Sequence, residues 1–434
     1  GGWLAEAPYW FSVTGAGAAF VFPILAVLLI PVGLAFSELT AMLPYSSAVD
    51  VWTTNALGHK AGWATQWMMF LVQVVEPPMM AFIFLTAFKY FVPLAPSMDI
   101  PVAIGIVVVW YILSNFDIKL TGNLANVFFF SMIGISLVVA FSFFTSGSWK
   151  LSNISAQGGF FPMGFQGIFM AMAVFALKFI GFEMTPTMIE ETNFPAKRMN
   201  RIILSALFVP ALLYFIVVLA MAGLAPHGEI AGMKMPEPEL IAKIGLPGIL
   251  AILAIIAGIL HAFTTLMGFW VASARVLYGS AQLNQLPHWF MKTNRYGQPH
   301  ISNLAVLFFS IFFCLFTGDN WVVYIYAVSC ITAGIVYFMC CLDAMILRRK
   351  HPEWERPYKA PGGDLLFIAG MAISVWIIIG SSLSLNLGGY VSLIIYCLIG
   401  VGVYLFMLSY RKKHPELDVN ISLTPADKDR FHTL

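Results

Sequence analysis

Long apolar runs separated by short polar loops make up most of this chain. A membrane-spanning helix needs about 20 mostly apolar residues, and the chain contains twelve candidate segments, the first of them short. They are expected near 3–14, 18–44, 62–92, 99–116, 124–146, 164–190, 201–224, 247–281, 301–317, 320–348, 364–384 and 388–410. The runs do not alternate apolar and polar residues as barrel strands do, so helices are predicted.

Lys and Arg residues fall mainly into alternate loops of this predicted topology. Counting from the loop after the second helix, one side collects 18 of the 23 Lys and Arg residues, the other side collects 4, and Lys178 stays within a span. Cytoplasmic loops of membrane proteins carry the excess of positive charge. We therefore expect a multi-pass protein of a plasma or inner membrane, with both termini in the cytoplasm.

The composition excludes several classes of protein. The chain is 60% hydrophobic and only 10% charged, whereas soluble proteins carry about 25% charged residues. Soluble enzymes, nucleic-acid binders and disordered chains are therefore excluded, and the lipid bilayer is the expected surrounding. The five cysteines lie in apolar stretches without metal-ligand spacing. No nucleotide-binding or nucleophile motif occurs, so we expect no enzyme activity, no metal and no cofactor.

Four charged residues fall deep within predicted spans, namely Glu6, Glu76, Lys178 and Glu183. A charge at this depth is costly, so each is a candidate for substrate binding or ion coupling. Structural roles are the alternatives. Glu6 would be hydrated near the extracellular surface, Glu76 would satisfy backbone groups freed by Pro77, and Lys178 would pair with Glu183. His261 is expected to be a packed core histidine rather than a proton carrier.

Two spans contain helix breakers. Gly1, Gly2 and Pro8 interrupt the first span, and Gly181 with Pro186 interrupts the sixth. Broken helices at equivalent places of two halves point to a transporter site. The two spans are five apart, which fits two five-helix repeats. Freed N–H groups bind a carboxylate and freed carbonyls bind an ammonium, and an amino acid has both groups.

Three stretches of the second half match the pattern of a known family. Residues 274–278 read ARVLY, 286–287 read LP, and 294–299 read NRYGQP. This order resembles the eighth helix and following loop of the amino acid–polyamine–organocation (APC) permeases, where S-R-x-L-Y precedes L-P and K-x-N-x-x-G-x-P. Residues 179–183 (FIGFE) and 190–198 (EETNFPAKR) are similar to that family's sixth helix and the run after it.

Two N-terminal stretches extend the resemblance over most of the chain. Residues 37–44 (SELTAMLP) look like the end of the family's second helix, and residues 1–4 (GGWL) look like the break in its first. The resemblance implies a LeuT-like, all-α transmembrane fold with a 5+5 inverted repeat and two peripheral helices. It also implies that the cytoplasmic half of the first helix precedes Gly1.

One permease domain is expected for the whole chain, because no loop is long enough to form a second. The inverted repeats would cover 1–146 and 164–348, followed by peripheral helices within 364–410 and a cytoplasmic tail at 411–434. By the same resemblance, Met132 stands where many family members carry a lysine that replaces a sodium ion.

The resemblance also assigns roles to individual residues. Gly1, Gly2 and Trp3 would hold the substrate carboxylate. Phe179, Ile180 and Gly181 would hold its amine. Leu177 and Phe269 would act as gates, and Ser329 would line the site.

These observations predict a secondary transporter of amino acids or amines that works by proton-linked symport or exchange. Glu6, Glu76 and Glu183 outnumber Lys178, and this acidic surplus suits a substrate with an ammonium group. The same four residues are the candidates for coupling, and Lys178 would be neutral, paired with a glutamate or facing a substrate carboxylate. The alternatives are a transporter of polyamines or cationic amines, a non-transporting nutrient sensor and, less compatible with broken helices, an ion channel.

Overall fold

The computed structural model describes all residues except 1, 117, 159–161, 163, 188, 190–194, 319, 418–420 and 428–434. The described part consists of helices joined by loops and contains no strand. Its α-helices are α1 (Trp3–Thr14), α2 (Ala18–Leu28), α3 (Ile30–Met42), α4 (Val49–Leu57), α5 (His59–Val74), α6 (Glu76–Lys89), α7 (Asp99–Ser114), α8 (Ile118–Thr145), α9 (Leu151–Ser155), α10 (Gly164–Phe175), α11 (Met184–Thr187), α12 (Met199–Ala222), α13 (His227–Ala231), α14 (Pro236–Lys243), α15 (Gly248–Gln282), α16 (His300–Leu315), α17 (Trp321–Lys350), α18 (Gly363–Ser384) and α19 (Leu387–Lys413).

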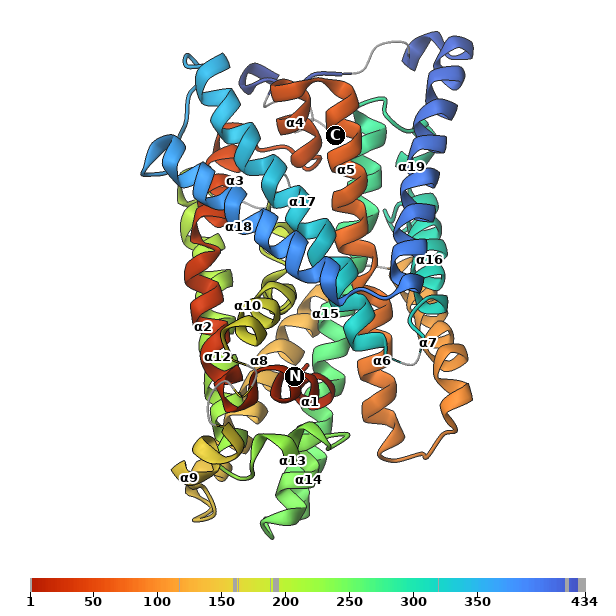
Figure 1. Ribbon diagram of the computed structural model, residues 1–434. Coiled ribbons are helices and arrows are strands. Elements are labelled where there is room, and N and C mark those ends of the chain that lie inside the picture. Colours follow the sequence, from red (N-terminus) through yellow and green to blue (C-terminus); the bar gives the residue numbers. More distant parts are fainter. Residues whose placement is uncertain are drawn as a thin grey trace.

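The predicted spans are present as apolar helices. Ten helical runs in the described residues are long and apolar enough to cross a membrane, and Ile30–Met42 and His300–Leu315 are shorter apolar helices. The first two predicted segments are divided differently, because α1 and α2 join through a 3-10 turn at Gly15–Gly17 into one run. In Figure 1, α1 lies across the long axis of the molecule, whereas α2 and α3 run along it.

Four short helices form in three of the predicted loops. Figure 1 shows α4 at one end of the molecule and α9, α13 and α14 at the opposite end. We refer to these as the α4 end and the α14 end. Helices α13 and α14 pack against α1, so the loop between α12 and α15 covers the start of the chain.

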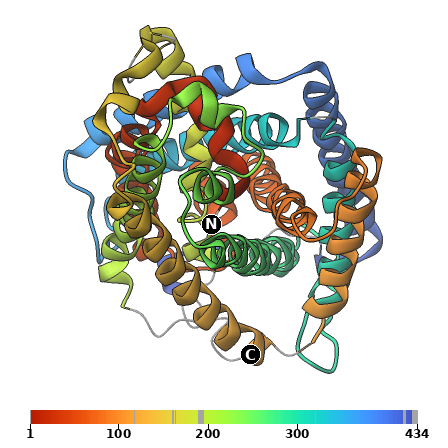
Figure 2. The same cartoon turned by 90° about the horizontal axis from the view of Figure 1, so that it is seen from below.

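The centre of the bundle is formed by α1, α5, α6, α10, α15 and α17, which pack on one another. Figure 2 looks along the bundle and shows α1 near the middle. Helix α8 lies outside, and its Phe130 and Phe141 are 69% and 68% exposed. Large exposed apolar side chains on outer helices match a lipid-facing surface, since only the bilayer can cover them.

Two long spans are interrupted where the sequence has helix breakers. The span His59–Lys89 is divided at Val75, and Pro77 and Pro78 fall in the first turn of α6, where a missing N–H is tolerated. The sixth span is divided between α10 and α11. Pro8, in contrast, lies inside α1 without ending it, so the predicted interruption there is wrong. A transmembrane helix tolerates proline when neighbouring groups compensate for the lost hydrogen bond.

Candidate functional site

Glu6 of α1 and Lys178 next to the sixth-helix break form a buried ion pair. Lys178 Nζ lies 2.6 Å from Glu6 Oε1, and the two side chains are 4% and 0% exposed. The interpretation of Glu6 as a hydrated surface residue is therefore wrong, and so is the pairing of Lys178 with Glu183. The first and sixth helices therefore approach each other closely. The sequence alone does not show this contact, because the two residues are far apart in the chain.

Aromatic rings surround the ammonium of Lys178. Its Nζ lies 4.9 Å from the ring centre of Tyr326 and 5.8 Å from that of Trp10, within the range of a cation–π interaction. Trp10 Nε1 donates a hydrogen bond of 2.8 Å to the Tyr326 hydroxyl. Tyr214 packs edge-on against Trp10 at 5.6 Å, so the rings hold one another in place.

Glu76 begins α6 and lies in the same region. It is 1% exposed, and its Oε1 accepts a hydrogen bond of 2.8 Å from Ser329 Oγ on α17. Its carboxylate is within electrostatic range of Lys178, Glu6 and Glu183. The structure thus brings the four charged residues singled out in the sequence together with Ser329.

The sixth-helix break is formed by Ile180 and Gly181. Ile180 has φ −58° and ψ 127°, and Gly181 has φ +135°, which L-residues rarely adopt. Glu183 turns back and accepts the Gly181 N–H with both carboxylate oxygens at 2.9 Å, while the Tyr337 hydroxyl donates to it at 3.3 Å. Glu183 therefore stabilises the break itself.

The start of the first helix differs from the break in the sixth, since Gly2 has helical backbone angles of φ −60° and ψ −28°. Gly2 precedes α1 without a side-chain cap, and Gly1 lies outside the described residues. A Cβ at Gly2 would lie 2.3 Å from Glu6 Oε2 and 3.2 Å from His261 Nε2. A side chain here would have to displace the Glu6 carboxylate, and His261 of α15 borders the site. The expectation that His261 is a packed residue rather than a proton carrier stays a prediction.

Trp3 is directed to the α14 end. Its Nε1 donates a hydrogen bond of 3.1 Å to Glu237 Oε1 of α14. Glu237 was not singled out in the sequence, because a glutamate in a loop carries no special signal. Burial raises the pKa of Glu237 to about 7, and the Trp3 hydrogen bond opposes that shift.

The remaining predicted site residues are buried or half-buried. Leu177 and Phe179 are 3% and 2% exposed on either side of Lys178, and Ile180 is half-buried. Phe269 of α15 is 5% exposed. A gating role for Leu177 and Phe269 stays a prediction.

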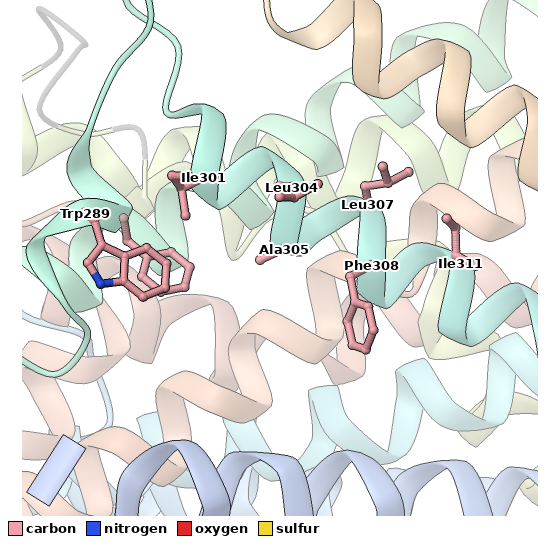
Figure 3. A pocket seen from close by; sticks show the side chains of 8 residues that line it. Trp289, Ile301, Leu304, Ala305, Leu307, Phe308 and Ile311 are labelled. Carbon is pink, nitrogen blue, oxygen red and sulfur yellow. The ribbon is translucent and has the colours of Figure 1, made fainter. Parts of the chain in front are cut away.

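A separate open groove of about 570 Å³ lies along α16 and a 3-10 turn at His288–Met291. Figure 3 shows its lining, which is entirely apolar and includes Trp289, Ile301 and Phe308. None of its lining residues belongs to the site around Lys178. Within the described part of the chain, no group of three His, Cys, Asp or Glu residues could hold a metal ion.

The comparisons with known proteins agree on one protein family. Residues 5–404 match the family model described as amino acid permease. The branched-chain amino acid permease BcaP of Bacillus subtilis (strain 168) is 24% identical, with 94% of this chain and 90% of the relative aligned. The gamma-aminobutyric acid permease of the same organism is 24% identical over 78% of this chain and 74% of its own length.

A third relative comes from another bacterium. The D-serine/D-alanine/glycine transporter of Escherichia coli (strain K12) is 25% identical, with 85% of this chain and 81% of the relative aligned. The family match covers nearly the whole chain, and the all-helical membrane fold agrees with it. This chain is therefore a multi-pass integral membrane protein that belongs to the amino acid permease family of the APC superfamily.

Proposed function

We propose that this protein is a secondary transporter that carries an amino acid across the membrane by alternating access. The observation that carries the proposal is the buried Glu6–Lys178 pair, which joins the start of the first helix to the break in the sixth. Ion pairs and broken helices at membrane depth are expensive, and transporters use them to build substrate sites.

The substrate would lie between the start of the first helix and the break in the sixth. Gly2 is the N-cap of α1 and Trp3 is its first residue, and backbone N–H groups at a helix start suit a carboxylate. The irregular backbone at Phe179, Ile180 and Gly181 suits an ammonium. Glu76 and Ser329 would line the same space, since they are hydrogen-bonded to each other beside these groups.

The buried carboxylates favour protons as the ion whose movement is coupled to transport. Lys178 is committed to Glu6, whereas Glu76 and Glu183 have no lysine or arginine partner among the described residues. A carboxylate without a cation is expensive to bury, so these two are the candidates to take up and release a proton. By the resemblance to the family, Met132 would stand at the position of the coupling lysine, and this chain would then differ from members that use that lysine.

The orientation follows from the positive charges. The α4 end would face the cytoplasm, since the predicted loops on that side carry most of the Lys and Arg residues. The α14 end would then face outward, with α13 and α14 covering α1.

A counterflow assay tests the proposal. The purified protein is placed in liposomes loaded with one unlabelled candidate, and uptake of the same labelled compound is followed for a panel of amino acids and the corresponding amines. We expect saturable counterflow for at least one amino acid, without electrical conductance. Binding without counterflow would instead indicate a sensor, a conductance would indicate a channel, and uptake of amines alone would indicate a cationic-amine transporter.

A further inference from the structure

We propose that Lys178 is a built-in cation that fills a cation-binding site, so that the transporter accepts amino acids with uncharged side chains and rejects those with a second ammonium. The claim about substrates rests on the proposed transport function. The claim about the site itself rests only on the geometry around Lys178.

The surroundings of Lys178 Nζ are those of an ammonium receptor. Such receptors combine a carboxylate with the faces of aromatic rings. Here Glu6 supplies the carboxylate at 2.6 Å, and Tyr326 and Trp10 supply the rings at 4.9 and 5.8 Å. All three side chains are completely buried.

The rings are fixed independently of the lysine. Trp10 donates its N–H to the Tyr326 hydroxyl and packs against Phe22 at 5.0 Å and Tyr214 at 5.6 Å. These contacts do not involve Lys178, so the receptor should keep its shape when the lysine is removed.

The lysine reaches this receptor from the break in the sixth helix. It is the third residue of the 3-10 turn Ala176–Phe179, which ends where Ile180 leaves the helical conformation. Its ammonium therefore lies at the proposed substrate site rather than on a distant structural element.

One carboxylate oxygen of Glu6 is left over. Lys178 binds Oε1, while Oε2 is buried and accepts no hydrogen bond from the described residues. Oε2 lies next to Gly2, at the start of α1. Glu6 is thus neutralised by the chain's own cation before any substrate arrives.

This arrangement has a direct consequence for specificity. A substrate with a cationic side chain would bring a second positive charge near Lys178, and like charges repel strongly where water is excluded. An uncharged side chain meets no such repulsion. Norleucine and lysine test this difference cleanly, because their side chains differ by the terminal ammonium.

The first experiment measures the receptor without transport. Lys178→Ala removes the internal cation and leaves room for ethylammonium, and the probe is ethylammonium chloride compared with sodium chloride at equal concentration. We expect ethylammonium to raise the Tm of purified Lys178→Ala but not of the wild type, since a ligand stabilises the folded state that binds it. The matched control is Lys89→Ala, whose lysine pairs with Asp99 outside this site.

A second variant covers the case in which an unpaired Glu6 prevents folding. Glu6→Gln combined with Lys178→Ala removes both charges, so it should fold and show no response to ethylammonium. If Lys178→Ala folds only when ethylammonium is present, the proposal is supported. If ethylammonium neither restores nor stabilises Lys178→Ala, or acts equally on the double variant, the cation receptor is refuted.

The third measurement addresses the substrate class. In liposomes, we expect norleucine to compete with the transported amino acid better than lysine does in the wild type. Lys178→Ala should shift this ratio toward lysine by about tenfold, the effect of one charge-assisted interaction. Were Lys178 instead to bind the substrate carboxylate, the variant would weaken both amino acids relative to their decarboxylated amines, with no shift between norleucine and lysine.

Failure of the inference and failure of the transport function give different results. A wild type that transports amino acids while Lys178→Ala ignores ethylammonium refutes only the cation receptor. A wild type without counterflow, combined with ethylammonium binding to Lys178→Ala, refutes the transport function and the substrate claim but leaves the receptor intact.

Discussion

The four buried charges have three different kinds of partner. Lys178 binds Glu6, Glu76 accepts from Ser329, and Glu183 accepts from the Gly181 backbone. Removing one member of a buried ion pair typically costs about 3–5 kcal/mol, because the other charge stays in a medium that solvates it poorly. Neutral replacements that keep a hydrogen bond are therefore the informative variants at this scale.

Glu76→Gln is expected to reduce uptake of the substrate at least about tenfold while leaving the protein folded. The amide oxygen can still accept from Ser329, but the charge near Lys178 and Glu183 is lost. Uptake and thermal stability are measured in the same preparation. Glu239→Gln on the exposed face of α14 is the matched control, and uptake close to wild type in Glu76→Gln would remove this residue from the site.

Gly181→Ala tests the break in the sixth helix. The glycine has φ +135°, with open space around the position of a Cβ, so the substitution introduces strain without a clash. We expect a loss of about 1–3 kcal/mol together with reduced transport. Gly105→Ala on α7 also meets open space but is helical, and its stability should stay near that of the wild type. Equal behaviour of the two variants would contradict a role for the Gly181 conformation.

At the scale of elements, side-chain hydrogen bonds attach the peripheral helix α19 to α5 of the central bundle. Trp67 and Trp63 of α5 donate their indole N–H groups to the carbonyls of Tyr396 and Gly400. The Tyr396 hydroxyl donates back to the Trp67 carbonyl at 2.7 Å. These hydrogen bonds join backbone to side chain across two helices, which fixes their register.

Gly400→Ala should loosen this attachment. Its Cβ would lie 2.3 Å from Trp67 Nε1, so either the ring or the helix must move. A destabilisation of about 1–3 kcal/mol is expected, measured as a lower Tm in detergent. Gly402→Ala, two residues further on and facing open space, should be nearly neutral, and a similar loss in both variants would argue against the close approach.

The α4 end contains a buried acid outside the membrane-spanning helices. Asp50 of α4 accepts hydrogen bonds from Gln285 Nε2 at 2.7 Å and Thr54 Oγ1 at 3.1 Å. Burial raises the pKa of Asp50 from 3.8 to about 7, although both hydrogen bonds oppose the shift. The folded protein therefore holds this proton more tightly than the unfolded chain does.

A raised carboxyl pKa stabilises the folded state at low pH. The contribution is fully present below pH 3.8 and is lost as the pH rises to about 7. We expect the thermal stability of the wild type to fall between pH 5 and pH 7 by more than that of Asp50→Asn, which cannot ionise. Parallel pH profiles of the two proteins would show that Asp50 does not titrate in this range.

At the scale of the whole molecule, the proposed alternating access would open the two ends in turn around a fixed centre. The centre contains buried carboxylates, and the outer helices present apolar side chains to the bilayer. In the proposed mechanism, transport would be coupled to the ion that these central carboxylates bind.

Uptake should therefore depend on pH and not on sodium. In liposomes, an inward proton gradient in choline buffer is expected to drive accumulation of the substrate, and replacing choline with sodium should leave the rate unchanged. Dissipating the gradient with a protonophore is the control. An absolute requirement for sodium would rule out this coupling.

The apolar pattern alone determined much about this protein. Run length and polarity specified a helical membrane protein, and the positions of Glu6, Glu76, Lys178 and Glu183 marked its costly sites, because charge at membrane depth has few explanations. The order of short motifs was sufficient to indicate the APC family. These features are local in the chain, so a single sequence contains them.

Only the tertiary structure decided which residues the buried charges pair with. Lys178 lies five residues from Glu183 but binds Glu6, 172 positions away. The two aromatic rings next to its ammonium, Trp10 and Tyr326, are hydrogen-bonded to each other across 316 positions. Glu183 accepts the Gly181 N–H at the backbone break, while Lys178 pairs with a residue of another helix. Helix periodicity specifies which face a residue occupies, whereas the packing of distant helices specifies what that face meets. That is why the ion pair and the cation receptor emerged only from the folded chain.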